Sequence, residues 1–145
     1  MARGRVLIAD DNAVYRRLLA RFIGAHQDLE VVGEAEDGLS AVSLCAELKP
    51  DVVVMDLRMP GADGFEATRL VKAAVPGARV IAITAHRCED DAQRCLEAGA
   101  EAFLSKGQAD IGLIALIREL VVAESRGGLP VDGQSRPSEA PPSGS

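Results

Sequence analysis

The feature that most restricts the fold is a run of four apolar residues, Val52-Val53-Val54-Met55, that ends in Asp56. The run contains no polar alternation, which is typical of a strand buried on both faces inside a parallel sheet. Residues 57–61 then lead into a Pro-Gly pair, which cannot extend a strand and favours a turn. We therefore expect Asp56 at the carboxyl end of a central strand, facing the loops of the sheet.

Short apolar runs alternate with amphipathic segments along most of the chain. Strands are predicted at residues 6–9, 29–32, 52–55, 80–83 and 102–104. Helices are predicted at residues 14–23, 39–48, 87–98 and 109–124, and between a capping box at Asp63 and the Pro76-Gly77 pair. Because parallel strands need crossover connections, this alternation predicts the α/β class, with a doubly wound five-stranded parallel sheet and five helices.

Polar residues follow four of the predicted strands. They are Asp10 and Asp11 after the first strand, Asp56 after the third, Thr84 after the fourth and Lys106 after the fifth. Since the carboxyl ends of parallel strands lie along one edge, where ligands bind, these side chains should be neighbours. Three close carboxylates repel one another unless a cation compensates, and Mg²⁺ is the natural candidate because it prefers hard oxygen ligands.

Each of these residues also has a simpler interpretation. Asp10 and Asp11 could cap the first helix, because carboxylates favour the positive end of a helix dipole. Thr84 could be a buried hydroxyl at a strand end, and Lys106 could be a surface charge. Their coincidence at one edge of the sheet favours a functional site.

Composition limits the class of protein. With 145 residues, 48% of them hydrophobic, the chain can form one domain with a core. The net charge is -6, and the three Lys and thirteen Arg are scattered, so no direct nucleic-acid binding is expected. Cys45, Cys88 and Cys95 form no C-x-x-C pair and should be reduced. No apolar stretch approaches membrane-spanning length, and a cytoplasmic location is expected.

The sequence resembles the receiver domain of bacterial two-component response regulators over residues 4–124. The resemblance rests on four motifs at strand ends: Ile8-Ala9-Asp10-Asp11, Val54-Met55-Asp56-Leu57-Arg58-Met59-Pro60-Gly61, Ile83-Thr84-Ala85 and Phe103-Leu104-Ser105-Lys106. It implies a flavodoxin-like fold with strand order 2-1-3-4-5. The first and third strands would then be neighbours, which brings the three aspartates together.

The resemblance implies a phosphorylation chemistry. Asp56 would accept a phosphoryl group from a sensor histidine kinase or a phosphotransfer protein, in a reaction that needs Mg²⁺. The family's metal site is carried over to the carboxylates of Asp11 and Asp56, the backbone carbonyl of Arg58, and Asp10 acting through bound water. The domain would not be an enzyme in the usual sense, because it would catalyse only its own phosphorylation and dephosphorylation.

The same resemblance assigns the residues that stabilise the phosphoryl group and report its presence. The Lys106 ammonium and the Thr84 hydroxyl would each contact a phosphoryl oxygen. Phe103 would turn inward when Thr84 moves toward the phosphoryl group, and Ala85 would border the entrance together with Arg58. The surface that switches would be the face of the fourth helix, fifth strand and fifth helix.

The output is less determined by the sequence. Many receivers have a proline directly after the lysine. Here Gly107 stands at that position, as in NarL/FixJ-type regulators. Residues 125–145 are rich in Gly, Pro and Ser and are predicted to be a disordered tail or linker. The chain is therefore either a stand-alone receiver or part of a longer regulator. The bunched apolar residues Leu113, Ile114, Leu116 and Ile117 suggest a homodimer through the switching face.

Other functional classes fit the sequence less well. A flavin-binding module would need a Ser/Thr/Gly-rich phosphate loop where Asp10-Asp11-Asn12 stands. A haloacid-dehalogenase-like phosphatase would carry Asp-x-Asp after the first strand, and the adjacent Asp10 and Asp11 lack that spacing. A receiver-like interaction module that acts without phosphorylation is the more serious alternative.

Overall fold

The apolar run of residues 52–55 forms the middle of the molecule. It belongs to β3 (Val52–Asp56), and all five residues of this strand are buried, as expected for a strand covered on both faces. The computed structural model describes residues 3–59, 63–85 and 89–126, apart from the side chains of residues 89–90, 108–111 and 123–126.

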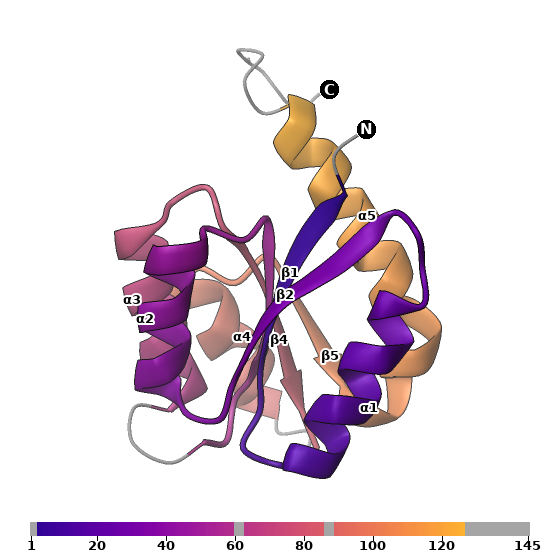
Figure 1. The fold of residues 1–145 in the computed structure, drawn as a ribbon. Helices are drawn as coiled ribbons and strands as arrows, with labels where there is room; N and C mark the ends of the chain where they lie inside the picture. The colour runs from indigo at the N-terminus through magenta and orange to yellow at the C-terminus, as the bar shows by residue number, and fades with distance from the viewer. Residues whose placement is uncertain (1–2, 60–62, 86–88, 127–145) are drawn as a thin grey trace, which may run out of the picture.

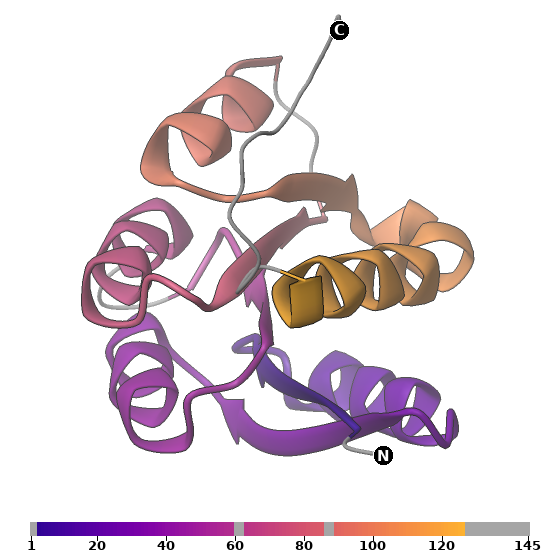
Figure 2. The same cartoon turned by 90° about the horizontal axis from the view of Figure 1, so that it is seen from above.

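Five parallel strands form one sheet in the order β2-β1-β3-β4-β5, which confirms the predicted flavodoxin-like topology. The other strands are β1 (Gly4–Ala9), β2 (Leu29–Ala35), β4 (Arg79–Thr84) and β5 (Ala102–Ser105). The helices are α1 (Ala13–Gly24), α2 (Gly38–Leu48), α3 (Gly64–Ala74), α4 (Glu89–Ala98) and α5 (Ala109–Arg126), with a 3-10 turn η1 (Lys106–Gln108) before α5. Helices α1 and α5 cover one face of the sheet, and α2, α3 and α4 cover the other (Figures 1 and 2).

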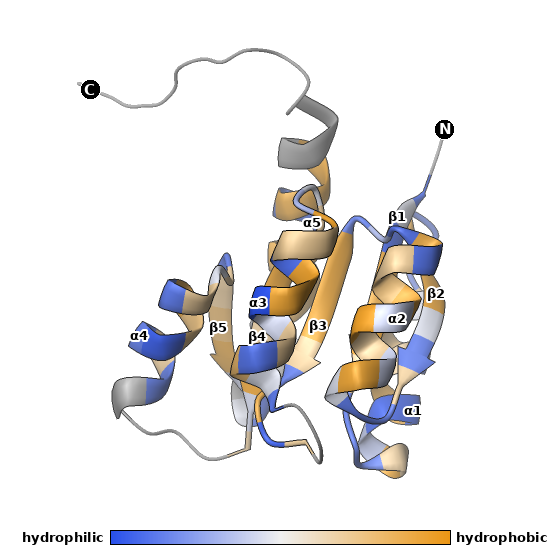
Figure 3. Ribbon diagram, turned by 90° about the vertical axis from the view of Figure 1, so that its left-hand side faces the viewer, coloured by the Kyte–Doolittle hydropathy of each residue, from blue (hydrophilic) through white to orange (hydrophobic). Residues whose placement is uncertain are grey.

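The two faces of the sheet have separate apolar cores, and β3 contributes to both. Val53 and Met55 pack in the core under α2, α3 and α4, whereas Val52 and Val54 pack in the core under α1 and α5. Successive side chains of a strand point to opposite faces, so a strand with two covered faces needs an unbroken apolar run. In Figure 3, hydrophobic colour follows β3 and hydrophilic colour covers much of α4.

Most element boundaries lie close to the predicted ones, and β2 differs most. It ends at Ala35 rather than at residue 32, because its backbone stays paired with β1 as far as Ala9. This strand lies at the edge of the sheet and is only partly buried. Gly33 and Glu34 therefore give no apolar signal, which explains why the sequence pattern missed the last part of the strand.

Two helix ends have the capping residues that the sequence predicts. The Asp63 side chain accepts the Glu66 N–H at 2.9 Å, which confirms one half of the capping box, while the Glu66 carboxylate pairs with Arg69 instead. After α4, Gly99 has a φ of 110° and donates its N–H to the Leu96 carbonyl. Gly99 is thus the expected C-terminal cap, in a left-handed conformation that favours glycine.

The apolar surface of α5 is smaller than the sequence suggested. Leu113, Ile114 and Ile117 are buried in the core under α1 and α5, and Leu116 is partly buried against it. The bunched residues are therefore used mainly for packing within the chain. These residues therefore leave little surplus apolar surface to support a homodimer, and dimerisation stays a prediction.

Two further expectations concern the cysteines and the chain end. Cys45 and Cys95 are free and buried, and burial raises the pKa of each thiol to about 11, which makes both unreactive. Cys88 lies outside the described residues, as does the predicted disordered segment beyond Arg126. In the described part of the chain, no helix combines the length and the hydrophobicity that crossing a membrane requires.

Gly64, the first residue of α3, lies against the backbone at the end of β3. A Cβ atom at this position would overlap the Asp56 carbonyl oxygen and the Leu57 Cα. The Gly64 N–H also donates a hydrogen bond to the Leu57 carbonyl at 3.1 Å. The chain folds back on Asp56 here, so this turn needs a residue without a side chain.

Replacing Gly64 by Ala should lower the free energy of unfolding by about 1–3 kcal/mol, because the added methyl group must displace the Asp56 backbone. Gly24→Ala at the end of α1 is the control, since nothing lies within 4 Å of a Cβ added there. That variant should be neutral or slightly stabilising. Urea unfolding measures both variants, and equal stability of the two would contradict the close approach.

Candidate functional site

The carboxyl ends of the strands bring together all the polar residues that the sequence singled out at this edge. Asp10 directly follows β1, Asp56 is the last residue of β3, and Thr84 is the last residue of β4. Lys106 directly follows β5 as the first residue of η1. In Figure 1 this edge is the lower end of the sheet. Because β1 and β3 are neighbours, the aspartates at their carboxyl ends lie side by side.

Asp10, Asp11 and Asp56 form an acidic cluster. One carboxylate oxygen of each lies within 4.8 Å of the others. Asp10 and Asp56 are buried, and Asp11 is exposed. Burial, followed by the negative charge of Asp10, raises the pKa of the Asp56 carboxyl to about 6, although the Arg58 N–H and the Lys106 charge partly oppose the shift.

Lys106 is the cation that faces this cluster. Its Nζ lies 2.8 Å from Asp10 Oδ2 and 3.8 Å from Asp56 Oδ2, with 18% of the side chain exposed. The same nitrogen lies 4.3 Å from the ring centroid of Tyr15, which is a cation–π distance. The ammonium is thus held between two carboxylates and an aromatic face, and it is closer to Asp10 than to Asp56.

The acidic loop after β1 is fixed by Asn12 and Arg16. The Asn12 side chain accepts the Tyr15 N–H at 3.0 Å, which makes Asn12 the N-cap of α1, and its own N–H donates to Asp10 Oδ1 at 2.8 Å. Arg16 donates to the Asp10 backbone carbonyl at 2.7 Å and pairs with Glu34 at 3.0 Å. The simpler interpretation of Asp10 and Asp11 as helix caps is therefore wrong, because Asn12 has that role.

Arg58 has two separate contacts. Its backbone N–H donates to Asp56 Oδ1 at 3.2 Å, and its guanidinium pairs with Asp91 of α4 at 2.9 Å. The Asp91 side chain is only 3% exposed, whereas that of Arg58 is 52% exposed. The loop that follows β3 is thus tied to α4. The proposed metal ligation by the Arg58 carbonyl stays a prediction.

The remaining predicted site residues border the cluster. Thr84 is fully buried at the end of β4 and lies opposite Ser105 in the sheet register, and Ala85 beside it is exposed. Phe103 of β5 is partly buried against the core under α2, α3 and α4. An inward movement of Phe103 stays a prediction, and His86 lies outside the described residues.

The donor set fits Mg²⁺. Asp10 Oδ2 is buried, and its partner is the Lys106 ammonium at 2.8 Å. Two buried carboxylates and one exposed carboxylate converge there, and one ammonium group lies beside the two buried ones. A small divalent cation with oxygen ligands would balance the negative charge that one ammonium leaves uncompensated.

Sequence reasoning missed four residues of this site: Tyr15, Asn12, Arg16 and Asp91. Asn12 could have been found as an N-cap, because it directly precedes the apolar pattern of α1. Asp91 gave no signal, since an acidic residue in a polar helix looks solvent-exposed. Tyr15 is the only tyrosine of the chain, but its distance from Lys106 in the sequence hides the contact.

A family model described as the response regulator receiver domain matches residues 6–118. Response regulator GacA of Pseudomonas viridiflava is 40% identical over 124 residues, which cover 84% of this chain and 56% of GacA. Transcriptional regulatory protein LiaR of Bacillus subtilis is 43% identical over 102 residues, covering 70% of this chain and 48% of LiaR. The chain thus spans about half the length of these curated relatives.

Solved structures show the same fold. The signal receiver domain of the putative response regulator NarL from Mycobacterium tuberculosis superimposes with a TM-score of 0.80 and 30% sequence identity. The match covers 84% of this chain and 98% of that domain. The five-stranded sheet and its helices are therefore a complete receiver fold.

Replacing Asp56 by Asn should stabilise the fold at neutral pH when no divalent cation is present. The Asp56 pKa of about 6 lies above its ordinary value of 3.8, so between these pH values the folded state binds more protons than the unfolded state. Ionisation of Asp56 then costs stability as the pH rises through this window. The gain should be about 1–3 kcal/mol above the upper pKa and fade toward the lower one, as urea unfolding across this range would show.

Asp28→Asn is a control of opposite sign. Hydrogen bonds from Arg118, at 2.9 and 3.2 Å, lower the pKa of the exposed Asp28 carboxyl. This group stabilises the fold above its unfolded-state pKa, and the contribution is lost as the pH falls. The Asp28→Asn variant should therefore be less stable at neutral pH, with a difference that fades on acidification. An Asp56→Asn variant less stable than wild type at neutral pH would contradict the electrostatic account.

Replacing Arg58 by Ala should lower the free energy of unfolding by about 1–2 kcal/mol, because Asp91 is left buried without its ion-pair partner. The loss is smaller than for a fully buried pair because Arg58 is half-exposed. Arg69→Ala, which breaks the exposed Arg69–Glu66 pair, should change stability by less than about 0.5 kcal/mol. Adding Asp91→Asn to Arg58→Ala should restore part of the loss, and equal effects of the two arginine variants would exclude a special role for Asp91.

Proposed function

Since the chain belongs to the response regulator receiver domains, we propose that it is a phosphorylation switch whose phosphoryl acceptor is Asp56. The donor is a sensor histidine kinase or a phosphotransfer protein. The observation that carries this proposal is the convergence of Asp10, Asp11 and Lys106 on the buried Asp56 carboxylate. A switch of this kind changes its own covalent state and has no separate substrate to turn over.

Asp56 would act as the nucleophile. One of its carboxylate oxygens attacks the donor phosphorus, forming a P–O bond as the bond from phosphorus to the donor's imidazole nitrogen breaks. With a pKa of about 6, the carboxyl is largely ionised at neutral pH and available for attack. Its Oδ1 is oriented by the Arg58 N–H, and its Oδ2 lies toward the Lys106 ammonium.

The neighbouring groups would stabilise charge on the transferred phosphoryl group. Mg²⁺, held by Asp10, Asp11, Asp56 and the Arg58 backbone carbonyl, would supply positive charge for the phosphoryl oxygens. The Lys106 ammonium is already 3.8 Å from Asp56 Oδ2 and would donate to a second oxygen. The Thr84 hydroxyl, at the end of the adjacent strand, would contact the third.

A phosphoryl donor needs a docking surface beside the acidic edge, and α1 offers one. Val14 and Leu18 lie one turn apart on one face of α1, and they are 71% and 58% exposed. Phe22 continues this stripe, and Leu39 at the start of α2 is also exposed. Because α1 begins beside Asp10 and Asp11, a histidine that reaches Asp56 would bring its own helix over this stripe.

The output of the switch would be read on the face of α4, β5 and α5. Phosphorylation at the site would move Thr84, and Phe103 on β5 would follow. Arg58 supports the involvement of α4, because its ion pair with Asp91 joins that helix to the acceptor loop. The family setting, and relatives such as a transcriptional regulatory protein, favour a role in gene regulation through an output domain, a partner or a homodimer.

Incubation with acetyl phosphate and Mg²⁺ tests the proposal directly. Intact-mass measurement should show one added phosphoryl group on the wild-type chain, because the acyl phosphate is covalent. Asp56→Asn should gain none, since its amide is not a nucleophile, and removal of Mg²⁺ with a chelator should also prevent the gain. Asp28→Asn, at the other end of the sheet, should react like wild type. An unchanged wild-type mass would favour the interaction module that acts without phosphorylation.

A further inference from the structure

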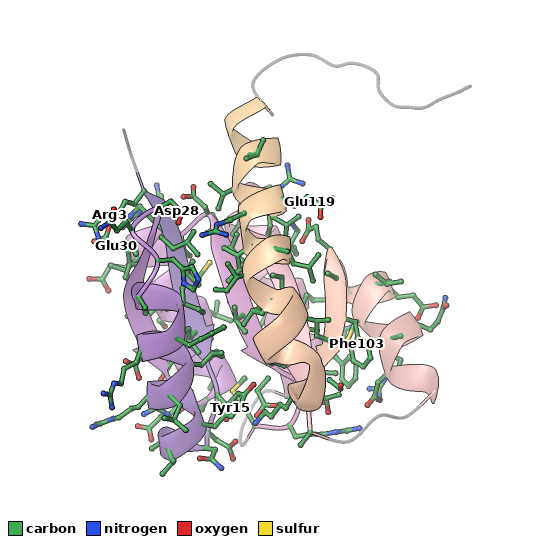
Figure 4. All side chains as sticks on the ribbon, turned by 90° about the vertical axis from the view of Figure 1, so that its right-hand side faces the viewer. Arg3, Tyr15, Asp28, Glu30, Phe103 and Glu119 are labelled. Carbon is green, nitrogen blue, oxygen red and sulfur yellow. The ribbon has the colours of Figure 1, made fainter. Side chains whose placement is uncertain are left out.

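Tyr15 contacts the cation of the site but is not part of the acceptor chemistry. The Lys106 Nζ lies 4.3 Å from the Tyr15 ring centroid, while the same atom lies 2.8 Å from Asp10 Oδ2. Figure 4 shows Tyr15 at the lower end of α1, at the same end of the molecule as the acidic edge. An ammonium at this distance is attracted by the electron-rich face of the ring.

The position of the Tyr15 ring is fixed by the acidic loop itself. The Tyr15 N–H donates to Asn12 Oδ1 at 3.0 Å, and the Asn12 N–H donates to Asp10 Oδ1 at 2.8 Å. The ring also packs against the core under α1 and α5. One short hydrogen-bond network therefore positions both Tyr15 and Asp10, and the Lys106 ammonium contacts both side chains.

A divalent cation bound at the acidic edge would displace the Lys106 ammonium from the carboxylates. Asp10 and Asp56 now share the Lys106 ammonium, and a metal ion would compete with it for the same oxygens. Lysine has a long flexible stem, so an ammonium displaced from a carboxylate can swing into solvent. The Tyr15 ring attracts the ammonium without carrying a negative charge, so it does not compete for the metal ion.

We propose that Tyr15 is a positioning residue, whose ring keeps the Lys106 ammonium at the acceptor edge when a divalent cation occupies the three carboxylates. This inference rests on the proposed function, because it is the phosphoryl oxygens that the retained ammonium would meet. The ring would also hold the Lys106 ammonium close to a bound metal ion, and the two positive charges would repel each other. Tyr15 therefore weakens metal binding while it promotes phosphoryl transfer.

Two substitutions distinguish the effect of the aromatic face of Tyr15 from the effect of its apolar bulk. Tyr15→Phe keeps an aromatic face, whereas Tyr15→Leu keeps an apolar side chain without one. Tyr15→Leu should slow phosphorylation by acetyl phosphate at saturating Mg²⁺ by about two- to fivefold, and should tighten Mg²⁺ binding by a similar factor. Tyr15→Phe should stay within about twofold of wild type in both measurements. Calorimetric titration with Mg²⁺ and intact-mass time courses provide the two values.

The opposite directions of these effects distinguish positioning from a structural role. A variant that only damaged the site would bind Mg²⁺ more weakly and react more slowly. In the Lys106→Met background, Tyr15→Leu should no longer change Mg²⁺ affinity, because there is no ammonium to hold. Weaker Mg²⁺ binding by Tyr15→Leu, or an unchanged effect in the Lys106→Met background, would overturn the proposal.

A metal-free measurement separates this proposal from the proposed function. The chain has only three lysines, Lys49, Lys72 and Lys106, so its lysine side-chain NMR signals are few and can be assigned by substitution. The Lys106 CεH₂ signal should be shifted upfield by the Tyr15 ring, stay shifted in Tyr15→Phe and return toward the other two in Tyr15→Leu. If wild type gains no phosphoryl group, the proposed function fails, whereas an unshifted Lys106 signal overturns the role of Tyr15 alone.

Discussion

The acidic edge depends on an imbalance of charge. Asp10 and Asp56 are buried beside Asp11, and the ammonium that faces them belongs to Lys106. Burial and mutual repulsion raise the pKa of Asp56, so the ionised site opposes folding at neutral pH. The same imbalance makes the edge attractive to a divalent cation. The carboxylates that destabilise the metal-free fold are therefore the groups that would bind a divalent cation, whose positive charge the proposed phosphoryl transfer needs.

The order of the strands creates this imbalance. In a parallel sheet every strand ends at the same edge, and the order β2-β1-β3-β4-β5 places the loops after β1 and β3 next to each other. Thr84 at the end of β4 and Lys106 after β5 lie on the side of β3 that is opposite β1. Two apolar cores hold the strands rigid, and the close approach at Gly64 returns the chain to the Asp56 backbone. The packing of the sheet thereby keeps the backbone positions of Asp10 and Asp56 next to each other.

Contacts from the edge reach the helices on both faces of the sheet. On one side, Arg58 follows Asp56 by two residues and pairs with the buried Asp91 of α4. On the other side, Tyr15 of α1 lies against the ammonium of Lys106. A change in charge at Asp56 would alter both contacts, because each includes a cation next to the site. The α1 stripe of Val14, Leu18 and Phe22 lies beside the same edge, so donor docking and phosphoryl transfer would use adjacent surfaces.

The sequence by itself determined the fold class, the strand order through the family resemblance, and the acidic and lysine residues at the sheet edge. Those features follow from local signals: an unbroken apolar run needs two covered faces, and a polar residue after such a run must lie at a strand end. The sequence pattern did not predict the last residues of β2, since an edge strand needs few apolar side chains. Only the tertiary structure decided the partners of the charged groups, including the Arg58–Asp91 pair, the Lys106–Tyr15 contact and the burial of most of the apolar residues of α5. These contacts join residues far apart in the chain, and their energies depend on distance and burial, which no local pattern of residues contains.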